Sequence, residues 1–211
     1  MRKTRLPDMR HDKCLSVCQM LRRLVACVVC LCATSNYAAT PAVSAGGSHS
    51  LALRADGTVL AWGNDSSGQL GAGRALFSTT PVTVSGISGV VTVAAGNSHV
   101  IVLKADGSVL AWGDNYYGKL GDGSSLNRST AVMVSGLTNV DRIWARGGHN
   151  FARKRDGTYW AWGNNGYGQL GDGSYESRNV PVRVSALDNV VDLSLDNRHT
   201  LALKPDGTVL T

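Results

Sequence analysis

The sequence predicts an all-β fold, an incomplete β-propeller, from three observations. His49, His99, His149 and His199 stand 50 residues apart with no insertion between them, and a fixed period of tens of residues marks a repeat architecture. Each period contains short runs rich in Val, Ile and Leu, and none has a sustained helical period. Four such strands in about 50 residues match one propeller blade. We therefore expect three to four four-stranded blades.

One period shows where the strands of a blade are expected. In the second copy they fall at residues 90–94, 100–103, 109–112 and 131–134. Asp106-Gly107 lies between the second and third runs and is a strong hairpin signal, predicting a type I′ turn in which both residues have positive φ. Because Asp in such turns bonds to its own backbone, we interpret the periodic Asp56, Asp106, Asp156 and Asp206 as structural.

Trp62, Trp112 and Trp162 end the third expected strand of their copies, and each precedes a glycine. An indole is large enough to fill the wedge between two blades, and its N–H then needs one acceptor. The loop that follows is rich in glycine, which permits several turns with positive φ. We therefore expect these tryptophans in the core.

The periodic residues resemble the regulator of chromosome condensation repeat. The matching motifs of the second copy are Ala95-Gly96-Asn97-Ser98-His99, Leu103-Lys104-Ala105-Asp106-Gly107, Ala111-Trp112-Gly113 and Gly118-Lys119-Leu120-Gly121-Asp122-Gly123. The resemblance covers three copies and a partial fourth, from about Ala45 to the C-terminus. It implies a β-propeller, usually of about seven blades. Members serve as exchange factors for a small nuclear GTPase, as secreted inhibitors of β-lactamases, or as interaction modules of larger proteins.

The chain departs from this repeat at a few places. Ala72 replaces the Asp of Gly-Asp-Gly, Arg146 replaces a glycine, and Leu195-Asp196-Asn197-Arg198 replaces Ala-Gly-x-Ser in the fourth copy. These changes affect the expected local turn geometry and leave the expected fold unchanged. The larger departure is number, because three blades and part of a fourth are fewer than a closed ring of the usual size needs.

Residues 1–45 are expected to be a basic leader with a signal peptide, and residues 46–211 the repeat array, truncated at its C-terminus. The leader holds all five cysteines and a net charge of +5, whereas the array carries +1. The basic composition therefore does not indicate nucleic-acid binding. An apolar run at residues 24–33 follows two arginines and precedes small residues, which is the order of a secretory signal. Ten residues are too few to span a bilayer, so we expect no membrane span.

The processing of this leader has several alternatives. Met20 is an alternative translation start, and Cys27 an alternative lipoprotein site. Signal cleavage is open among Ser35, Ala39 and Ala45. Each of these cleavages leaves a mature chain without cysteine, and the expected location is secreted or periplasmic.

No catalytic, cofactor-binding or metal-binding constellation is expected. Equivalent histidines of successive blades are related by rotation and need not converge on one ion, so we expect them to bond to neighbouring backbone. The loop from Asp114 to Gly123 lacks the alternating order and the later Glu of a calcium loop. Its Gly-x-Leu-Gly-Asp-Gly motif is no phosphate loop, since neither Lys-Ser/Thr nor a helix follows.

Two windows of each copy change freely while the framework stays constant. They cover residues 64–67, 114–117 and 164–167, and then 74–80, 124–130 and 174–180. Both are expected in loops, and loops on a rigid scaffold commonly bind partners. The windows contain residue types typical of interface anchors. The candidate partner-binding residues are Tyr116, Tyr117, Tyr167, Tyr175, Phe77, Arg74, Arg128 and Arg178.

We therefore expect a secreted or periplasmic protein–protein interaction module without catalysis, which binds an unidentified protein partner through these face loops. Nucleotide exchange on a small GTPase and inhibition of an extracellular hydrolase are alternatives, as is an enzyme or carbohydrate binder that uses a propeller face. A truncated gene fragment without independent function is another. Open propeller edges present unpaired strands, so self-association is expected as well.

Overall fold

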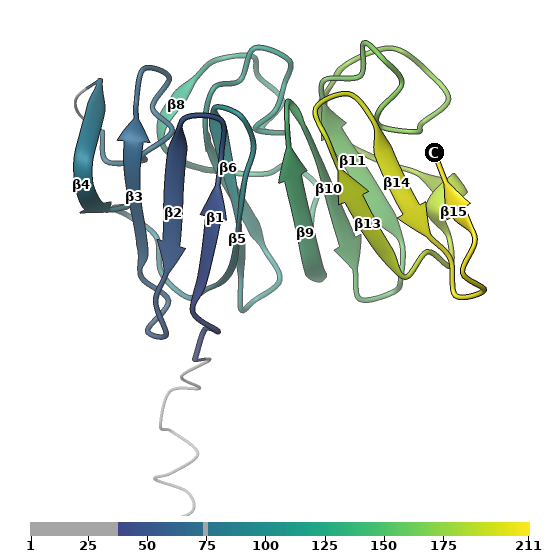
Figure 1. The fold of residues 1–211 in the computed structure, drawn as a ribbon, viewed down its shortest axis with the longest axis horizontal. Helices are drawn as coiled ribbons and strands as arrows, with labels where there is room; N and C mark the ends of the chain where they lie inside the picture. The colour runs from purple at the N-terminus through teal and green to yellow at the C-terminus, as the bar shows by residue number, and fades with distance from the viewer. Residues whose placement is uncertain (1–37, 74–75) are drawn as a thin grey trace, which may run out of the picture. The chain divides into compact units, whose positions relative to one another are not determined.

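The computed structural model describes residues 38–73 and 76–211. In these residues the chain forms three four-stranded antiparallel sheets and one three-stranded sheet (Figure 1). We call them blades 1 to 4 in chain order. The predicted signal run, Met20 and Cys27 lie outside the described residues, as does Arg74.

The blades repeat one meander. Blade 1 contains β1 (Ala42–Ala45), β2 (His49–Leu53), β3 (Val59–Asn64) and β4 (Phe77–Thr83). Blade 2 contains β5 (Val90–Ala95), β6 (His99–Lys104), β7 (Val109–Gly113) and β8 (Arg128–Met133). Blade 3 contains β9 (Val140–Arg146), β10 (His149–Lys154), β11 (Tyr159–Gly163) and β12 (Arg178–Arg183). A short 3-10 helix, η1 (Ser185–Leu187), leads to blade 4, which contains β13 (Asp192–Leu195), β14 (Thr200–Leu203) and β15 (Val209–Leu210).

The expected strands of the second copy are confirmed, and the first three agree with β5, β6 and β7 to within one residue. The last strand, β8, begins at Arg128, three residues before the expected start, because Arg128 pairs with Gly113 beyond a register shift. The first blade begins at Ala42, so it includes residues that the sequence pattern assigned to the leader.

The hairpin turns differ from the expected type I′. Gly107 has a φ of 80°, whereas Asp106 is not among the described residues with positive φ. The Gly107 N–H donates to the Lys104 carbonyl, and the Lys104 N–H donates to the Ser108 carbonyl. The donor–acceptor distance is 2.9 Å in both bonds. This is the three-residue loop in which one turn is followed by a left-handed residue. The Asp106 carboxylate accepts the Ser108 N–H at 2.9 Å, which confirms its structural role.

Successive blades pack through their first strands and an apolar layer. β1 contacts β5, β5 contacts β9, and β9 contacts β13, as Figure 1 shows. Three clusters of buried residues lie along this series. The first contains Trp112 together with Leu70 and Val84 of blade 1, and the second contains Trp162 together with Leu120 of blade 2. The expected core position is confirmed for Trp112 and Trp162, whereas Trp62 is only partly buried and lies outside these clusters.

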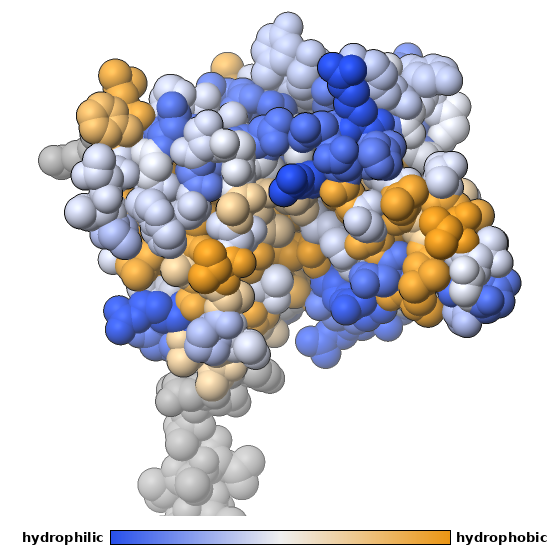
Figure 2. Space-filling model, viewed as in Figure 1, coloured by the Kyte–Doolittle hydropathy of each residue, from blue (hydrophilic) through white to orange (hydrophobic). Residues whose placement is uncertain are grey.

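The surface of the described residues is mixed in polarity. Figure 2 shows apolar residues gathered where blade 4 lies, and Leu203 and Val209 of this blade are 41% and 52% exposed. Over residues 38–73 and 76–211, no helix is long and apolar enough to span a bilayer.

Candidate partner-binding surface

The periodic histidines join neighbouring blades. The Nε2 of His99 lies 2.7 Å from Oδ1 of Asn150, and the Nε2 of His149 lies 3.1 Å from Oγ1 of Thr200. Each contact runs to a side chain of the next blade, so the expectation that these histidines bond to neighbouring backbone is wrong. Val100 occupies the equivalent position for His49, and neither ring nitrogen of His49 has a hydrogen-bond partner among the described residues.

Burial keeps these imidazoles neutral. Desolvation lowers the pKa of His49 to about 4, of His99 to about 3 and of His149 to about 4. For His99 the hydrogen bond that its Nε2–H donates to the Asn150 amide oxygen raises the pKa, but the desolvation that lowers it dominates. In the described part of the chain, no three His, Cys, Asp or Glu side chains lie close enough to hold a metal ion. His99 and His149 are tied into the scaffold by their hydrogen bonds to the next blade.

The loops between the third and fourth strands are held from inside. Asn115 is buried, its Oδ1 accepts the Leu120 N–H at 2.9 Å, and its Nδ2 lies 3.2 Å from the Asp122 carboxylate. Asn165 is equally buried and accepts the Leu170 N–H at 2.9 Å. These internal bonds fix the loop backbone, so the outward side chains are presented on a rigid support.

Two of the candidate arginines pair with carboxylates of their own loops. Arg128 contacts Asp122 at 3.2 Å, and Arg178 contacts Asp172 at 2.7 Å. Burial alone would raise the pKa of Asp122, but its hydrogen bonds from Ser124, Asn115 and Arg128 together lower it. In blade 1 the equivalent positions hold Ala72 and Ser78, so both partners of the pair change together.

Two of the candidate tyrosines, Tyr117 and Tyr167, lie close to cationic side chains, and Tyr116 packs against Tyr117. The Tyr116 and Tyr117 rings meet edge to face with centroids 4.7 Å apart. The Lys119 ammonium lies 5.8 Å from the centroid of Tyr117, and the Arg198 guanidinium lies 4.7 Å from that of Tyr167. Tyr117, Lys119, Tyr167 and Arg198 line one cavity of about 390 Å³. We call Tyr116 and these four residues the tyrosine–cation surface.

This surface combines loops of blades 2, 3 and 4. Tyr116 and Tyr167 are 72% and 58% exposed, whereas the aliphatic stem of Lys119 is buried and its ammonium pairs with the Asp114 carboxylate. The sequence pattern did not select Lys119 and Arg198 as binding residues. The available signal was disagreement between copies, because Gln69 and Gln169 occupy the position of Lys119.

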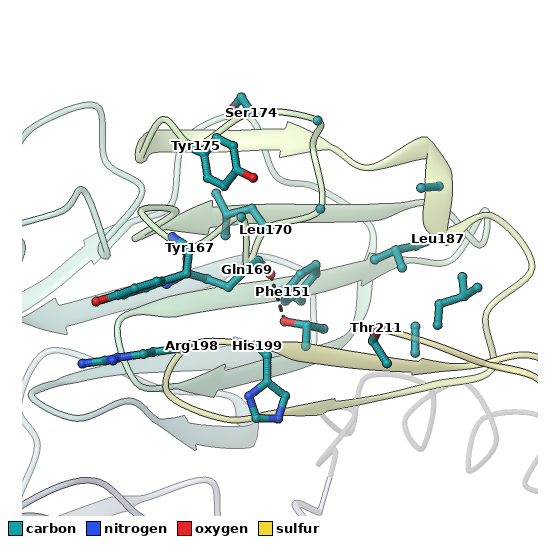
Figure 3. A pocket seen from close by; sticks show the side chains of 17 residues that line it. Phe151, Tyr167, Gln169, Leu170, Ser174, Tyr175, Leu187, Arg198, His199 and Thr211 are labelled. Carbon is teal, nitrogen blue, oxygen red and sulfur yellow. Dashed lines mark hydrogen bonds between the residues drawn. The ribbon is translucent and has the colours of Figure 1, made fainter.

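The remaining candidate residues lie elsewhere. Phe77 is 66% exposed at the start of β4 in blade 1, away from the loops that form the tyrosine–cation surface. Tyr175 is 76% exposed and lines a second cavity, which Tyr167 and Arg198 border as well (Figure 3). The structure thus brings together Tyr116, Tyr117 and Tyr167 from the candidate set.

Comparison with solved structures identifies the architecture. Human WBSCR16 is similar with a TM-score of 0.68 and 23% identity, over 83% of this chain and 48% of that chain. Prp20p from Saccharomyces cerevisiae is similar with a TM-score of 0.66 and 22% identity, over 80% of this chain and 44% of that chain. Yeast RCC1 (Prp20), in its complex with Kap60, is similar with a TM-score of 0.59 and 22% identity, over 80% of this chain and 54% of that chain. The predicted fold class, an all-β partial propeller, is confirmed, and the chain spans about half the length of these structures.

Sequence comparison gives the family. The regulator of chromosome condensation (RCC1) repeat matches residues 56–103, 106–152 and 156–203, and a second description of the same repeat matches residues 42–69 and 90–119. No curated protein matches the chain significantly. Because the repeat matches well over half of the sequence, and the folded blades resemble those of RCC1-type propellers, the chain belongs to the regulator of chromosome condensation (RCC1) repeat family.

Proposed function

We propose that this chain is a protein-interaction module, exported by its leader, that binds a protein partner through the tyrosine–cation surface and performs no catalysis of its own. The observation that carries the proposal is the gathering of Tyr116, Tyr117 and Tyr167 with Lys119 and Arg198 on loops of three blades.

The chemistry of this surface supports a protein partner. Tyr and Arg are the residue types that most often anchor interfaces, because they combine large contact area with directional polar groups. The internal bonds of Asn115 and Asn165 hold the loops before binding, so little conformational entropy is lost on association. Arg198 offers its guanidinium to a carboxylate. The partner surface we propose is therefore apolar with acidic groups.

Proteins of the same fold provide a precedent for the class of partner only. Prp20p binds Gsp1p and histones, and its complex with Kap60 is another protein assembly. At 22% sequence identity, these similarities support a shared fold and do not identify a shared partner. We take from them a protein as partner, and no partner identity.

Capture with the full chain as bait tests the proposal. Proteins from the extracellular or periplasmic fraction of the source cells would be captured by the wild type and by Tyr116→Ala/Tyr117→Ala. We expect at least one captured protein to bind the purified wild type saturably and the double variant about tenfold more weakly. Leu126→Ala, which changes an exposed residue of the same β7–β8 loop, is the control and should bind as the wild type does. If every captured protein binds the double variant as tightly as the wild type, the proposal is wrong.

A further inference from the structure

Two arginines lie at turn positions where other copies of the repeat hold a small residue. Arg146 ends β9, at a position that is glycine in blades 1 and 2. Arg198 lies in the β13–β14 turn, at a position that is serine in blades 1 and 2 and glycine in blade 3. Both turns lie at the same end of their blades (Figure 1). This end of the array therefore carries cations that the repeat itself does not require.

The first two blades exclude a side chain at the position of Arg146. A Cβ built on Gly46 would lie 2.2 Å from the His49 ring, and one built on Gly96 would lie 2.0 Å from the His99 ring. Blade 3 accommodates Arg146 at this position, and its side chain is exposed. The arginine is thus a feature of this blade, and the packing of the repeat does not explain it.

Neither arginine is neutralised by a carboxylate. Five other described arginines form ion pairs, whereas no ion pair among the described residues involves Arg146 or Arg198. Asp196, in the same turn as Arg198, contacts His199 at 3.9 Å instead. The Arg198 guanidinium lies 4.7 Å from the centroid of the Tyr167 ring, and Figure 3 shows the two side chains running alongside each other. Stacking orients a guanidinium and leaves its N–H groups free for an anionic ligand.

The turns that carry the two arginines touch each other. A Cβ built on Gly147 would lie 2.8 Å from the Cα of Asn197, so the two backbones are in direct contact. The Asn97 N–H donates to the Gly147 carbonyl at 2.8 Å, which joins the turn of blade 2 to the same group. Three neighbouring turns thus hold Arg146 and Arg198 on one support, and little conformational entropy is lost when a ligand binds.

Two adjoining cavities lie between these turns. Arg146 lines a cavity of about 530 Å³, and Arg198 lines the cavity of about 390 Å³ described above. Asn97 and Asn197 line both cavities. A ligand that occupies the two cavities meets one arginine in each, so the matching ligand carries at least two separate anionic groups.

The rest of the lining is polar. Among the described residues, the two cavities are lined by asparagine and serine but by no valine, leucine, isoleucine, methionine or phenylalanine. Figure 2 shows strongly hydrophilic residues gathered over this end of blades 3 and 4. Amide groups both donate and accept hydrogen bonds, as hydroxyl groups do. The core of a protein interface is more apolar than this lining. The lining therefore favours a hydroxyl-rich ligand, with Tyr117 and Tyr167 for the apolar faces of its rings.

We propose that these two cavities bind an acidic polysaccharide, with the carboxylate of one sugar at Arg146 and the carboxylate of a neighbouring sugar at Arg198. The guanidinium groups form charge-assisted hydrogen bonds with the carboxylates, and the asparagine amides bind the sugar hydroxyls. The site shares Arg198 and two tyrosines with the tyrosine–cation surface. Its existence does not depend on the function proposed above, since Arg146 belongs to this site alone.

Calorimetric titration of the full chain with polygalacturonate, a polymer of a uronic acid, tests the proposal. We expect saturable binding at physiological ionic strength, weakened about fivefold or more in each of Arg146→Gly and Arg198→Ser. Both substitutions introduce the residue that blades 1 and 2 hold at the same position, and each tests one cavity separately. Arg155→Ala is the matched control, because it removes the same charge from an exposed hairpin and introduces the alanine of blades 1 and 2. It should bind as the wild type does.

Two further polymers test the class of ligand. Polyglutamate carries carboxylates without sugar hydroxyls, and dextran carries hydroxyls without carboxylates, so both should bind at least about tenfold more weakly than polygalacturonate. Absence of saturable binding to polygalacturonate, equal affinity for either of these polymers, or an equal loss in Arg155→Ala would each overturn the proposal. Arg146→Gly should still bind the captured protein partner as the wild type does, so failure of this inference and failure of the proposed function give different results.

Discussion

Burial lowers the pKa of His49, His99 and His149, and this makes the array sensitive to acid. In the unfolded chain a histidine titrates near its ordinary value of 6.5, whereas burial lowers the pKa of His49 to about 4. The neutral ring therefore stabilises the fold fully above the unfolded pKa. That contribution decreases as the pH falls from 6.5 towards 4, where it has lost about 3 kcal/mol per histidine.

We expect the free energy of unfolding, measured with urea, to fall between about pH 7 and pH 5, because the unfolded state binds protons that the buried rings exclude. His49→Phe keeps a ring of similar size. It should reduce the number of protons taken up on unfolding, which is obtained from the slope of the unfolding free energy against pH, by about one. Equal pH dependence in the wild type and His49→Phe would show that His49 is not part of the acid response.

The Asp172–Arg178 pair gives a second test at the scale of single residues. Asp172 is nearly buried and accepts bonds from Asn165, Ser174 and Arg178. Asp172→Ala should therefore lower the free energy of unfolding by about 2 kcal/mol. Blade 1 holds Ala72 and Ser78 at these positions, and so Asp172→Ala/Arg178→Ser should be less destabilising than the sum of the two single changes.

Urea unfolding of the two single variants and the double variant measures this coupling. Glu176→Ala, which changes a side chain that is 83% exposed and also faces Arg178, serves as control and should change stability by less than about 0.5 kcal/mol. Strictly additive effects of the two changes would mean that the pair does not act as a unit.

Among the elements, β1 places a limit on how the leader can be processed. It pairs with β2 over Ala42–Ala45 and contacts β5 of blade 2. Ala39 precedes it, is buried, and donates its N–H to the Ala55 carbonyl at 3.0 Å. Cleavage after Ala45 would remove the whole strand, and cleavage after Ala39 would remove this anchor. Of the three cleavage sites, only Ser35 keeps both.

For the export proposed above, we therefore expect the processed chain, isolated from its host and analysed by intact mass, to begin at residue 36. A chain starting at residue 46 would have lost β1, and should unfold at a lower urea concentration than one starting at residue 36. A mature mass corresponding to residue 46, with unchanged stability, would show that β1 is dispensable.

The strands could be predicted from the sequence, and two features of the loops could not. Apolar runs rich in Val, Ile and Leu set the positions of β5, β6 and β7, and β6 is buried along both of its faces. The predicted type I′ turn at Asp106-Gly107 is wrong. The Asp-Gly dipeptide fits both a turn with two left-handed residues and a turn in which only the last residue is left-handed, and the sequence does not distinguish them. The close approach of Arg198 to Tyr167 joins blades 3 and 4, and no pattern within one repeat encodes it.

At the scale of the array, stability should vary from blade to blade. A repeat protein gains stability from each unit and from its contacts with the neighbours. Within residues 38–73 and 76–211, blades 2 and 3 are covered on both sides, whereas blade 4 has three strands and exposes Leu203 and Val209. We expect amide hydrogens of β14 to exchange at least about tenfold faster than those of β10, as measured by hydrogen–deuterium exchange with mass spectrometry. Uniform protection across both strands would indicate a single cooperative unit.

The contacts between blades have a consequence for how such arrays grow. His99 bonds to Asn150 and His149 to Thr200, partners that lie 51 positions apart, so at these two seams each neighbouring repeat carries one half of the contact. A duplication of 50 residues within the array, such as residues 101–150, would therefore place the His149 ring beside a new copy of Asn150, a partner that its counterpart His99 already accepts. Unequal recombination between copies can thus lengthen or shorten the gene in whole blades, without any compensating substitution at the junction.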